Sequence, residues 1–135
     1  MSRLIRTLII ASLLFYCRLY SQDAGTMLLW SFNTQAAVNR VAAGPDVDAN
    51  GFPDVFAGTQ DSMVYCLQGY GPGTGTLLWS HNTGGSILSM VTIQDVNADG
   101  IDDCVVGTAD DSVYWLSGKP SAAQRGLWSG GLGGE

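Results

Sequence analysis

Short apolar stretches alternate with turn residues along most of the chain, and this pattern is typical of β-strands. It predicts four successive strands, at 38–43, 54–58, 62–67 and 76–82. Glycine and proline dominate the link "QGYGPGTG" before the last of them. Beyond the first twenty residues, no segment keeps apolar residues at the helical period. The expected fold class is therefore all-β.

The strand pattern occurs twice at an interval of 49 residues, without a gap. "LLWSFNT" at 28–34 returns as "LLWSHNT" at 77–83, and "LWS" at 127–129 begins a third copy. Four short strands in a period of this length are typical of β-propeller blades. We therefore expect four-stranded antiparallel blades in a segment covering 22–135, with units of about 28–76 and 77–125 and a third starting at 126.

A closed propeller needs about four to eight blades, and this chain provides two and the beginning of a third. We expect an incomplete propeller. Either the chain belongs to a longer protein, or several chains assemble into a ring.

One tryptophan recurs at the same position of each copy, as Trp30, Trp79 and Trp128. Such tryptophans can stack on sugars, but a large aromatic repeated once per blade is typical of packing between neighbouring units. Tyr65 and Tyr114 repeat in the same way. The only histidine, His81, aligns with Phe32 and is expected to be a packing residue rather than a catalytic one.

Two acidic segments also repeat, "DVDANGFPD" at 46–54 and "DVNADGIDD" at 95–103. Each has oxygen-bearing side chains at positions 1, 3, 5 and 9 and a glycine at position 6. The glycine permits the sharp turn that brings the later residues round, so the carbonyl at position 7 can face inward. Asp102, at position 8 of the second loop, is expected to point outward.

Such a set of hard oxygen donors suits calcium, and magnesium less well because it requires a smaller octahedral shell. Neither loop contains histidine or cysteine, which argues against zinc or copper. A solvated hairpin turn is the alternative, since Asn-Gly and Asp-Gly are hairpin signals by themselves. An EF-hand is excluded because position 12 is Ala57 or Val106 rather than glutamate.

The loop, the apolar strand after it and a following glycine and aspartate turn resemble the FG-GAP and VCBS repeats of integrin-like β-propellers, at 46–69 and 95–118. The tryptophan strands and "VYCL" and "VYWL" resemble those of quinoprotein-like propellers. In the calcium-loop families the cation joins two strands of a blade and is mainly structural. The resemblance implies two calcium sites, with the ligands Asp46, Asp48, Asn50, the Phe52 carbonyl and Asp54, and Asp95, Asn97, Asp99, the Ile101 carbonyl and Asp103.

The N-terminus indicates an exported protein. Residues 1–21 contain arginines, a short apolar run and small residues, which is typical of a signal peptide. The alternatives are a membrane anchor, an N-terminal helix and, because of Cys17, a lipoprotein. The remaining chain has 3 basic and 12 acidic residues, which argues against nucleic acid as a partner. We expect a secreted, extracellular or cell-envelope location, where Cys66 and Cys104 are either a disulfide or two buried thiols.

No catalytic constellation can be assembled from these residues, so the chain is not expected to be an enzyme. The first hypothesis is a calcium-binding β-propeller segment acting as a structural, binding or adhesion module. Its partners would be calcium, an extracellular protein or carbohydrate, and further blades from a longer chain or other subunits. The second hypothesis is a fragment of a propeller enzyme, either a quinoprotein-type dehydrogenase or a polysaccharide lyase, with its catalytic residues outside this chain.

Overall fold

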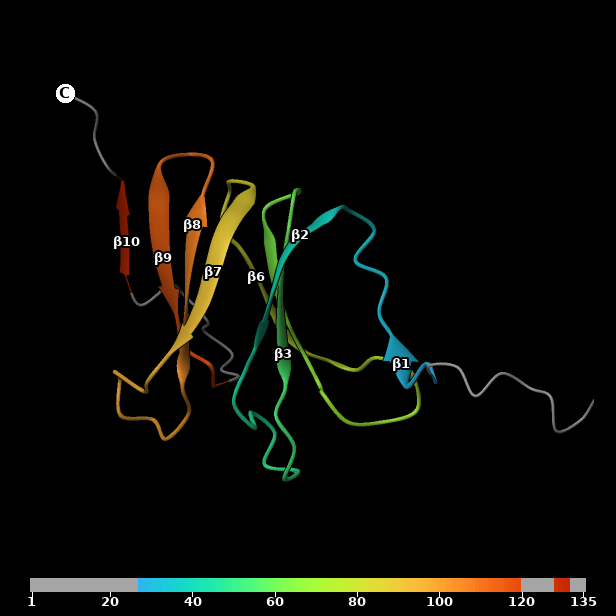
Figure 1. Ribbon diagram of the computed structural model, residues 1–135. Helices are drawn as coiled ribbons and strands as arrows, with labels where there is room; N and C mark the ends of the chain where they lie inside the picture. The colour runs from blue at the N-terminus through green and yellow to red at the C-terminus, as the bar shows by residue number, and fades with distance from the viewer. Residues whose placement is uncertain (1–26, 120–127, 132–135) are drawn as a thin grey trace, which may run out of the picture.

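The computed structural model describes residues 27–119 and 128–131 (Figure 1). The signal peptide expected at 1–21 lies outside these residues. Within the described ranges every regular element is a strand, so the chain is all-β. None of the described residues forms a helix long and apolar enough to span a membrane.

Two four-stranded antiparallel sheets account for most of the structure, and each keeps its strands in chain order. The first contains β2 (Val38–Ala43), β3 (Val55–Thr59), β4 (Met63–Leu67) and β6 (Leu77–Asn82). The second contains β7 (Ile87–Ile93), β8 (Asp103–Thr108), β9 (Ser112–Leu116) and β10 (Trp128–Gly131). The prediction of four-stranded antiparallel blades is confirmed. A short parallel pair joins β1 (Trp30–Ser31) to β5 (Gly73–Thr74).

The two sheets repeat one another in detail. Trp79 lies opposite Cys66 in the first sheet, and Trp128 lies opposite Trp115 in the second. Both inner strands also carry a register shift at the same place, between Val38 and Arg40 in β2 and between Ile87 and Ser89 in β7. The 49-residue sequence repeat is therefore a repeat of backbone geometry.

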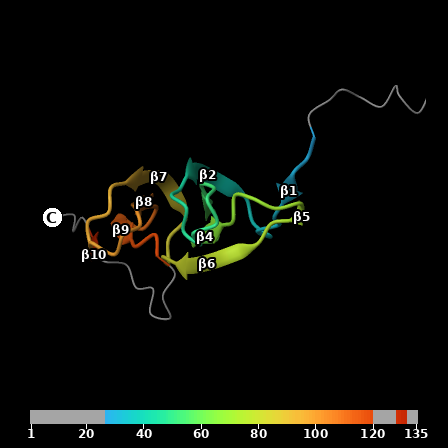
Figure 2. The ribbon, with the colours of Figure 1, turned by 90° about the horizontal axis from the view of Figure 1, so that it is seen from below.

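The sheets lie face to face, with β2 beside β7 in both views (Figures 1 and 2). The Asn39 side chain on β2 donates hydrogen bonds to the Ile87 carbonyl, at 3.0 Å, and to the Ser86 hydroxyl, at 3.2 Å. Near the other end of the strands, the Thr92 hydroxyl donates to the Ala43 carbonyl. Polar contacts thus fix how the two inner strands sit against each other.

The core fills the space between the sheets. It contains Val47, Phe56, Val64, Cys66 and Trp79 from the first repeat and Ile87, Cys104, Val106 and Leu116 from the second. Gly58 faces Ile87, and a side chain on this glycine would place its Cβ 2.5 Å from the Ile87 Cγ2. Gly58 therefore allows the close approach of the sheets. Burying each large apolar side chain here stabilises the fold by about 1.5–3 kcal/mol.

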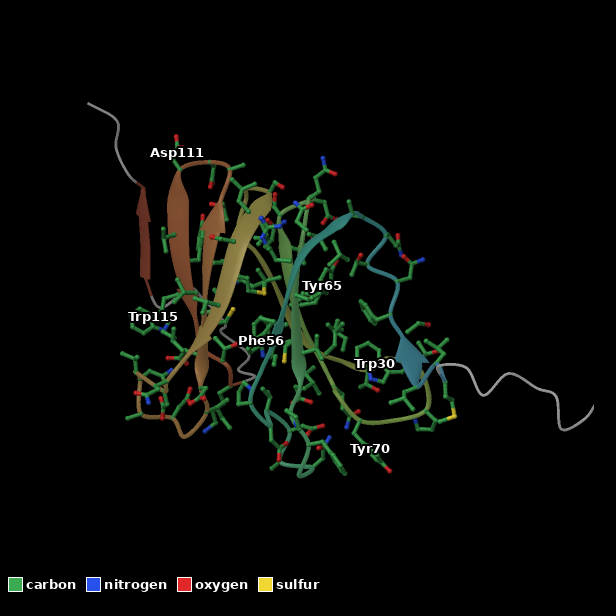
Figure 3. All side chains as sticks on the ribbon, viewed as in Figure 1. Trp30, Phe56, Tyr65, Tyr70, Asp111 and Trp115 are labelled. Atoms are coloured by element: carbon green, nitrogen blue, oxygen red, sulfur yellow. The ribbon has the colours of Figure 1, made fainter. Side chains whose placement is uncertain are left out.

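Trp79 is 7% exposed and packs on Phe56 with ring centroids 5.5 Å apart, which confirms the predicted packing role of this residue. His81 and Tyr114 have ring centroids 6.3 Å apart, and Phe32 and Tyr65 form the same contact at 5.7 Å. His81 is therefore a packing residue, as its alignment with Phe32 predicts. In Figure 3, Phe56 points toward the second sheet, and Tyr65 points to the opposite side, toward the segment that holds Trp30.

Cys66 and Cys104 are buried free thiols in the same core. Burial is the main cause that raises the pKa of both, and for Cys104 it reaches about 12. The nearby carboxylate of Asp54 adds to the effect at Cys66, and that of Asp103 at Cys104. The sequence left open either a disulfide or two buried thiols, and in the structure Cys66 and Cys104 are two buried thiols.

Candidate metal centres

The two acidic loops occupy equivalent places, between β2 and β3 and between β7 and β8. Both lie at the same end of the sheets, the lower end in Figure 1. Each loop begins with a half-buried aspartate and ends with a fully buried one.

The loop backbone takes left-handed turns that only a few residues adopt readily. Gly51 and Gly100, at position 6, both have φ of 91°, so the sequence requirement for glycine is met. Ala49 and Ala98, at position 4, have φ of 59° and 60°. Alanine in this region is strained by about 1 kcal/mol, and both loops tolerate the strain at the same place.

The aspartate at position 1 organises each loop by accepting backbone N–H groups. Asp46 accepts from Asn50 at 2.9 Å and from Gly51 at 2.7 Å. Asp95 accepts from Asp99 at 3.2 Å and from Gly100 at 2.8 Å. The loop backbone therefore turns around this carboxylate, which places positions 5 and 6 of the loop close to it.

The aspartate at position 9 is the most deeply placed member of each set. Asp54 and Asp103 are 1% and 0% exposed. Asp54 accepts the Val47 N–H and the Gly69 N–H, both at 2.8 Å. Such buried carboxylates need several donors to offset the loss of water.

Each loop brings three carboxylates together. One oxygen from each of Asp46, Asp48 and Asp54 lies within 4.8 Å of the others, and the same holds for Asp95, Asp99 and Asp103. At this separation each pair of charges repels by about 3 kcal/mol if the effective dielectric constant is about 20. Either set could hold a metal ion, which would remove that repulsion, and an all-oxygen donor set fits a hard cation such as calcium.

The remaining predicted ligands take part in the same loops. The side-chain oxygen of Asn50 accepts the Phe52 N–H at 2.9 Å, and that of Asn97 accepts the Asp99 N–H at 3.1 Å. Ligation by these amides and by the Phe52 and Ile101 carbonyls stays a prediction. The Phe52 ring itself lies outside the loop, stacked on Tyr70 at 4.2 Å.

Two supporting residues were not predicted. Gln68 donates its amide N–H to Asp48 at 2.7 Å, and Ser117 donates its hydroxyl to Asp99 at 2.7 Å. They are equivalent by the 49-residue repeat, but their side chains differ, so only the strand register reveals the shared role. Burial favours the neutral form of Asp99, but hydrogen bonds, chiefly from Ser117 and Asn97, outweigh it and lower the pKa of this carboxyl group.

The sequence predicts that Asp102 points outward, and the structure shows only part of this. It is exposed, yet its carboxylate turns back and accepts the Asp95 N–H at 3.3 Å. An aspartate at position 8 can cap the start of its own loop because the loop brings these two residues close together.

Residues 46–106 match the family model of FG-GAP-like repeats. The matched segment runs from the first acidic loop into β8, so it includes one complete repeat interval and both loops. The predicted resemblance to FG-GAP repeats is supported over this segment, whereas the resemblance to VCBS and quinoprotein-like repeats stays a prediction. No curated protein matches the chain.

Proposed function

We propose that this chain is a secreted, calcium-binding β-propeller segment that acts as a structural and binding or adhesion module. The observation that carries the proposal is the pair of acidic triads at equivalent places in two repeats. A site for chemistry occurs once, whereas a feature built identically into each blade serves the architecture. Calcium would be held by the three carboxylates of each loop, together with the side-chain amide oxygen of Asn50 or Asn97 and the backbone carbonyl at position 7.

The cation would act by neutralising carboxylates that join two strands. The position-1 aspartate holds the turn, and the position-9 aspartate is anchored below it by the backbone at Val47 and Gly69. A calcium ion between them would fix the β2–β3 loop, and a second ion would fix the β7–β8 loop. Calcium is favoured over magnesium because seven or so oxygen ligands in a flexible loop suit the larger ion.

Thermal unfolding in calcium, in magnesium and in a chelator tests this proposal. We expect calcium to raise the melting temperature of the full chain by several degrees, and magnesium by much less. Asp46→Asn and Asp95→Asn should each remove part of the calcium effect. Asp111→Asn is the matched control, because Asp111 is an exposed aspartate of the β8–β9 turn with φ of 62°, which asparagine adopts readily. A melting temperature independent of calcium would contradict the proposal.

Export is proposed from residues 1–21 alone. N-terminal sequencing of the protein recovered outside the producing cell is expected to begin close to residue 22. Recovery of the intact chain inside the cell would contradict a secreted or cell-envelope location. The acidic surface of the mature chain supports an extracellular protein or carbohydrate rather than nucleic acid as the further partner.

Contact with further blades is proposed from the segment 28–34. This segment contacts the first sheet in the same way as 77–83 contacts the second. Trp30 donates a hydrogen bond to the Gly69 carbonyl at 3.1 Å, and Trp79 donates one to the Gly118 carbonyl at 2.9 Å. However, β6 pairs with β4, whereas β1 pairs only over Trp30–Ser31 in the part of the chain that the structure describes.

Leu29 is 61% exposed, while its equivalent, Leu78, packs against the core. We therefore propose that this segment is the outer strand of a further blade, from a longer chain or another subunit. Light scattering should show that the 135-residue chain alone associates. A stable monomer that unfolds cooperatively would argue against further blades.

The alternative is that the chain belongs to a propeller enzyme. No single observation favours it, and the absence of a catalytic set within the described residues gives it no residues to test. The calcium experiments do not depend on the choice between the two.

A further inference from the structure

The two acidic loops form a matched pair within one molecule, and most of their contacts are the same. Asp46 and Asp95 each accept two backbone N–H groups from their own loop. Asp48 and Asp99 each accept one side-chain donor at 2.7 Å from just beyond the third strand of their sheet. The two loops exchange the carboxylate and the amide between positions 3 and 5, since Asp48 aligns with Asn97 and Asn50 with Asp99, but each loop has three carboxylates.

The position-9 carboxylates differ in the number of hydrogen-bond donors that they accept. In the first loop the two oxygens of Asp54 share two donors, the Val47 N–H on Oδ2 and the Gly69 N–H on Oδ1, both at 2.8 Å. A carboxylate oxygen has two lone pairs. One lone pair on each oxygen of Asp54 is thus left for a cation.

In the second loop Asp103 has three donors. Its Oδ1 accepts the Gly118 N–H at 3.3 Å, and its Oδ2 accepts the Val96 N–H at 3.2 Å. The third donor is the indole N–H of Trp115 on β9, labelled in Figure 3, which lies 3.1 Å from Oδ2. Both lone pairs of Oδ2 are therefore engaged. The equivalent of Trp115 in the first sheet is Cys66, so Asp54 has no such donor there.

Charges around the loops do not separate them. Lys119 brings a positive charge to the second loop, with its Nζ 3.4 Å from the Asp99 carbonyl. Asp102 brings a negative charge to the same loop, since its carboxylate accepts the Asp95 N–H. Both side chains are exposed and their effects oppose each other. The number of donors on the position-9 carboxylate is a difference that acts directly on a ligand oxygen.

We infer that the two calcium sites are unequal, and that Trp115 is the residue that weakens the second one by competing with the cation for Asp103. The inference rests on the proposed calcium function. The site formed by 46–54 fills first, and the site formed by 95–103 fills at higher calcium concentration. A hydrogen bond to a charged oxygen is strong enough that competition with it should weaken cation binding at the second site by about five- to ten-fold.

Calorimetric titration of the full chain with calcium tests the inference. The wild type is expected to give two classes of site that differ in affinity about five- to ten-fold. Asp95→Asn, which leaves the first site, should keep the tighter class, and Asp46→Asn should keep the weaker one. Adding Trp115→Phe to Asp46→Asn should strengthen binding about five-fold. The matched control is Trp115→Phe added to Asp95→Asn, which should leave the affinity unchanged.

Two equal sites in the wild type, or a Trp115→Phe substitution that fails to strengthen the second site, would overturn the inference while leaving the calcium proposal intact. The absence of any calcium-dependent heat in the wild type would instead overturn the proposed function, and the inference with it. The wild-type titration and the two single-site variants decide the order of filling even if Trp115→Phe does not fold.

Discussion

The indole N–H of Trp79 donates a hydrogen bond to the carbonyl oxygen of Gly118, 2.9 Å away in the next repeat. The N–H of Gly118 in turn donates to the carboxylate of Asp103, the last acidic residue of the second loop. The same connection runs from Trp30 through Gly69 to Asp54. Each acidic loop is therefore joined, through one glycine, to the tryptophan strand that precedes its sheet.

The first prediction concerns the tryptophan. Trp79→Phe should lower the free energy of unfolding by about 1–3 kcal/mol, because it leaves the buried Gly118 carbonyl without its donor. Urea unfolding measures this. Trp30→Phe is the matched control, since Trp30 makes the same hydrogen bond but is only half-buried and should cost less. Equal losses in the two variants would show that the buried hydrogen bond is not what matters.

The second prediction concerns the glycine between the two contacts. A Cβ on Gly118 would lie 2.1 Å from the Asp102 carbonyl oxygen, and one on Gly69 would lie 1.9 Å from the Pro53 carbonyl oxygen. Gly118→Ala should therefore displace the loop backbone and lower the free energy of unfolding by about 2–4 kcal/mol.

Gly51→Ala serves as the control for that substitution. Gly51 has φ of 91°, but a Cβ there meets no atom within 4 Å, so only backbone strain of about 1 kcal/mol is expected. Both variants are compared by urea unfolding in the presence of a chelator. A Gly118→Ala variant as stable as Gly51→Ala would contradict the close approach of the loop to this glycine.

Much of this arrangement is predictable from the sequence because the repeat supplies a second copy of each observation. The strands, the loop glycines and the packing role of Trp79 all follow from residues that recur at 49-residue spacing. The acidic loops are predictable because the ligand residues are close in the chain and their types are restricted by chemistry.

The rest depends on register between distant strands. Gln68 and Ser117 support the loops from about twenty residues away, and no shared residue type marks them. Trp115 donates to Asp103 from the neighbouring strand. The equivalent residue in the first repeat is Cys66, so the repeat does not predict a hydrogen-bond donor at this position. The state of Cys66 and Cys104 likewise depends on the packing of two sheets, which spacing alone does not fix.

The third prediction concerns the buried thiols. In a Cys17→Ser background, Cys66 and Cys104 should react with a thiol reagent only after unfolding, because both side chains are buried and their raised pKa values suppress the reactive thiolate. Two thiols should be titrated in denaturant and fewer than one in the native protein. Rapid native labelling, or the absence of thiols after unfolding, would contradict the structure.

The fourth prediction follows from the same pKa shifts. The folded state keeps the thiols protonated at a pH where the unfolded chain ionises them, near the ordinary pKa of 9.0. The stabilisation is therefore complete below about pH 9 and is lost as the pH rises toward 12. Urea unfolding at pH 8 and pH 10.5 should show this loss, and Cys104→Val should reduce it. An unchanged slope in that variant would assign the pH dependence to other groups.

Calcium stoichiometry, measured by equilibrium dialysis of the full chain, directly tests whether the two acidic loops bind cations. Two acidic triads at equivalent places predict two calcium ions per chain, one in Asp46→Asn or Asp95→Asn, and none when both substitutions are combined. Asp111→Asn should still bind two. A wild-type chain that retains no calcium would contradict the central claim that these loops are cation sites.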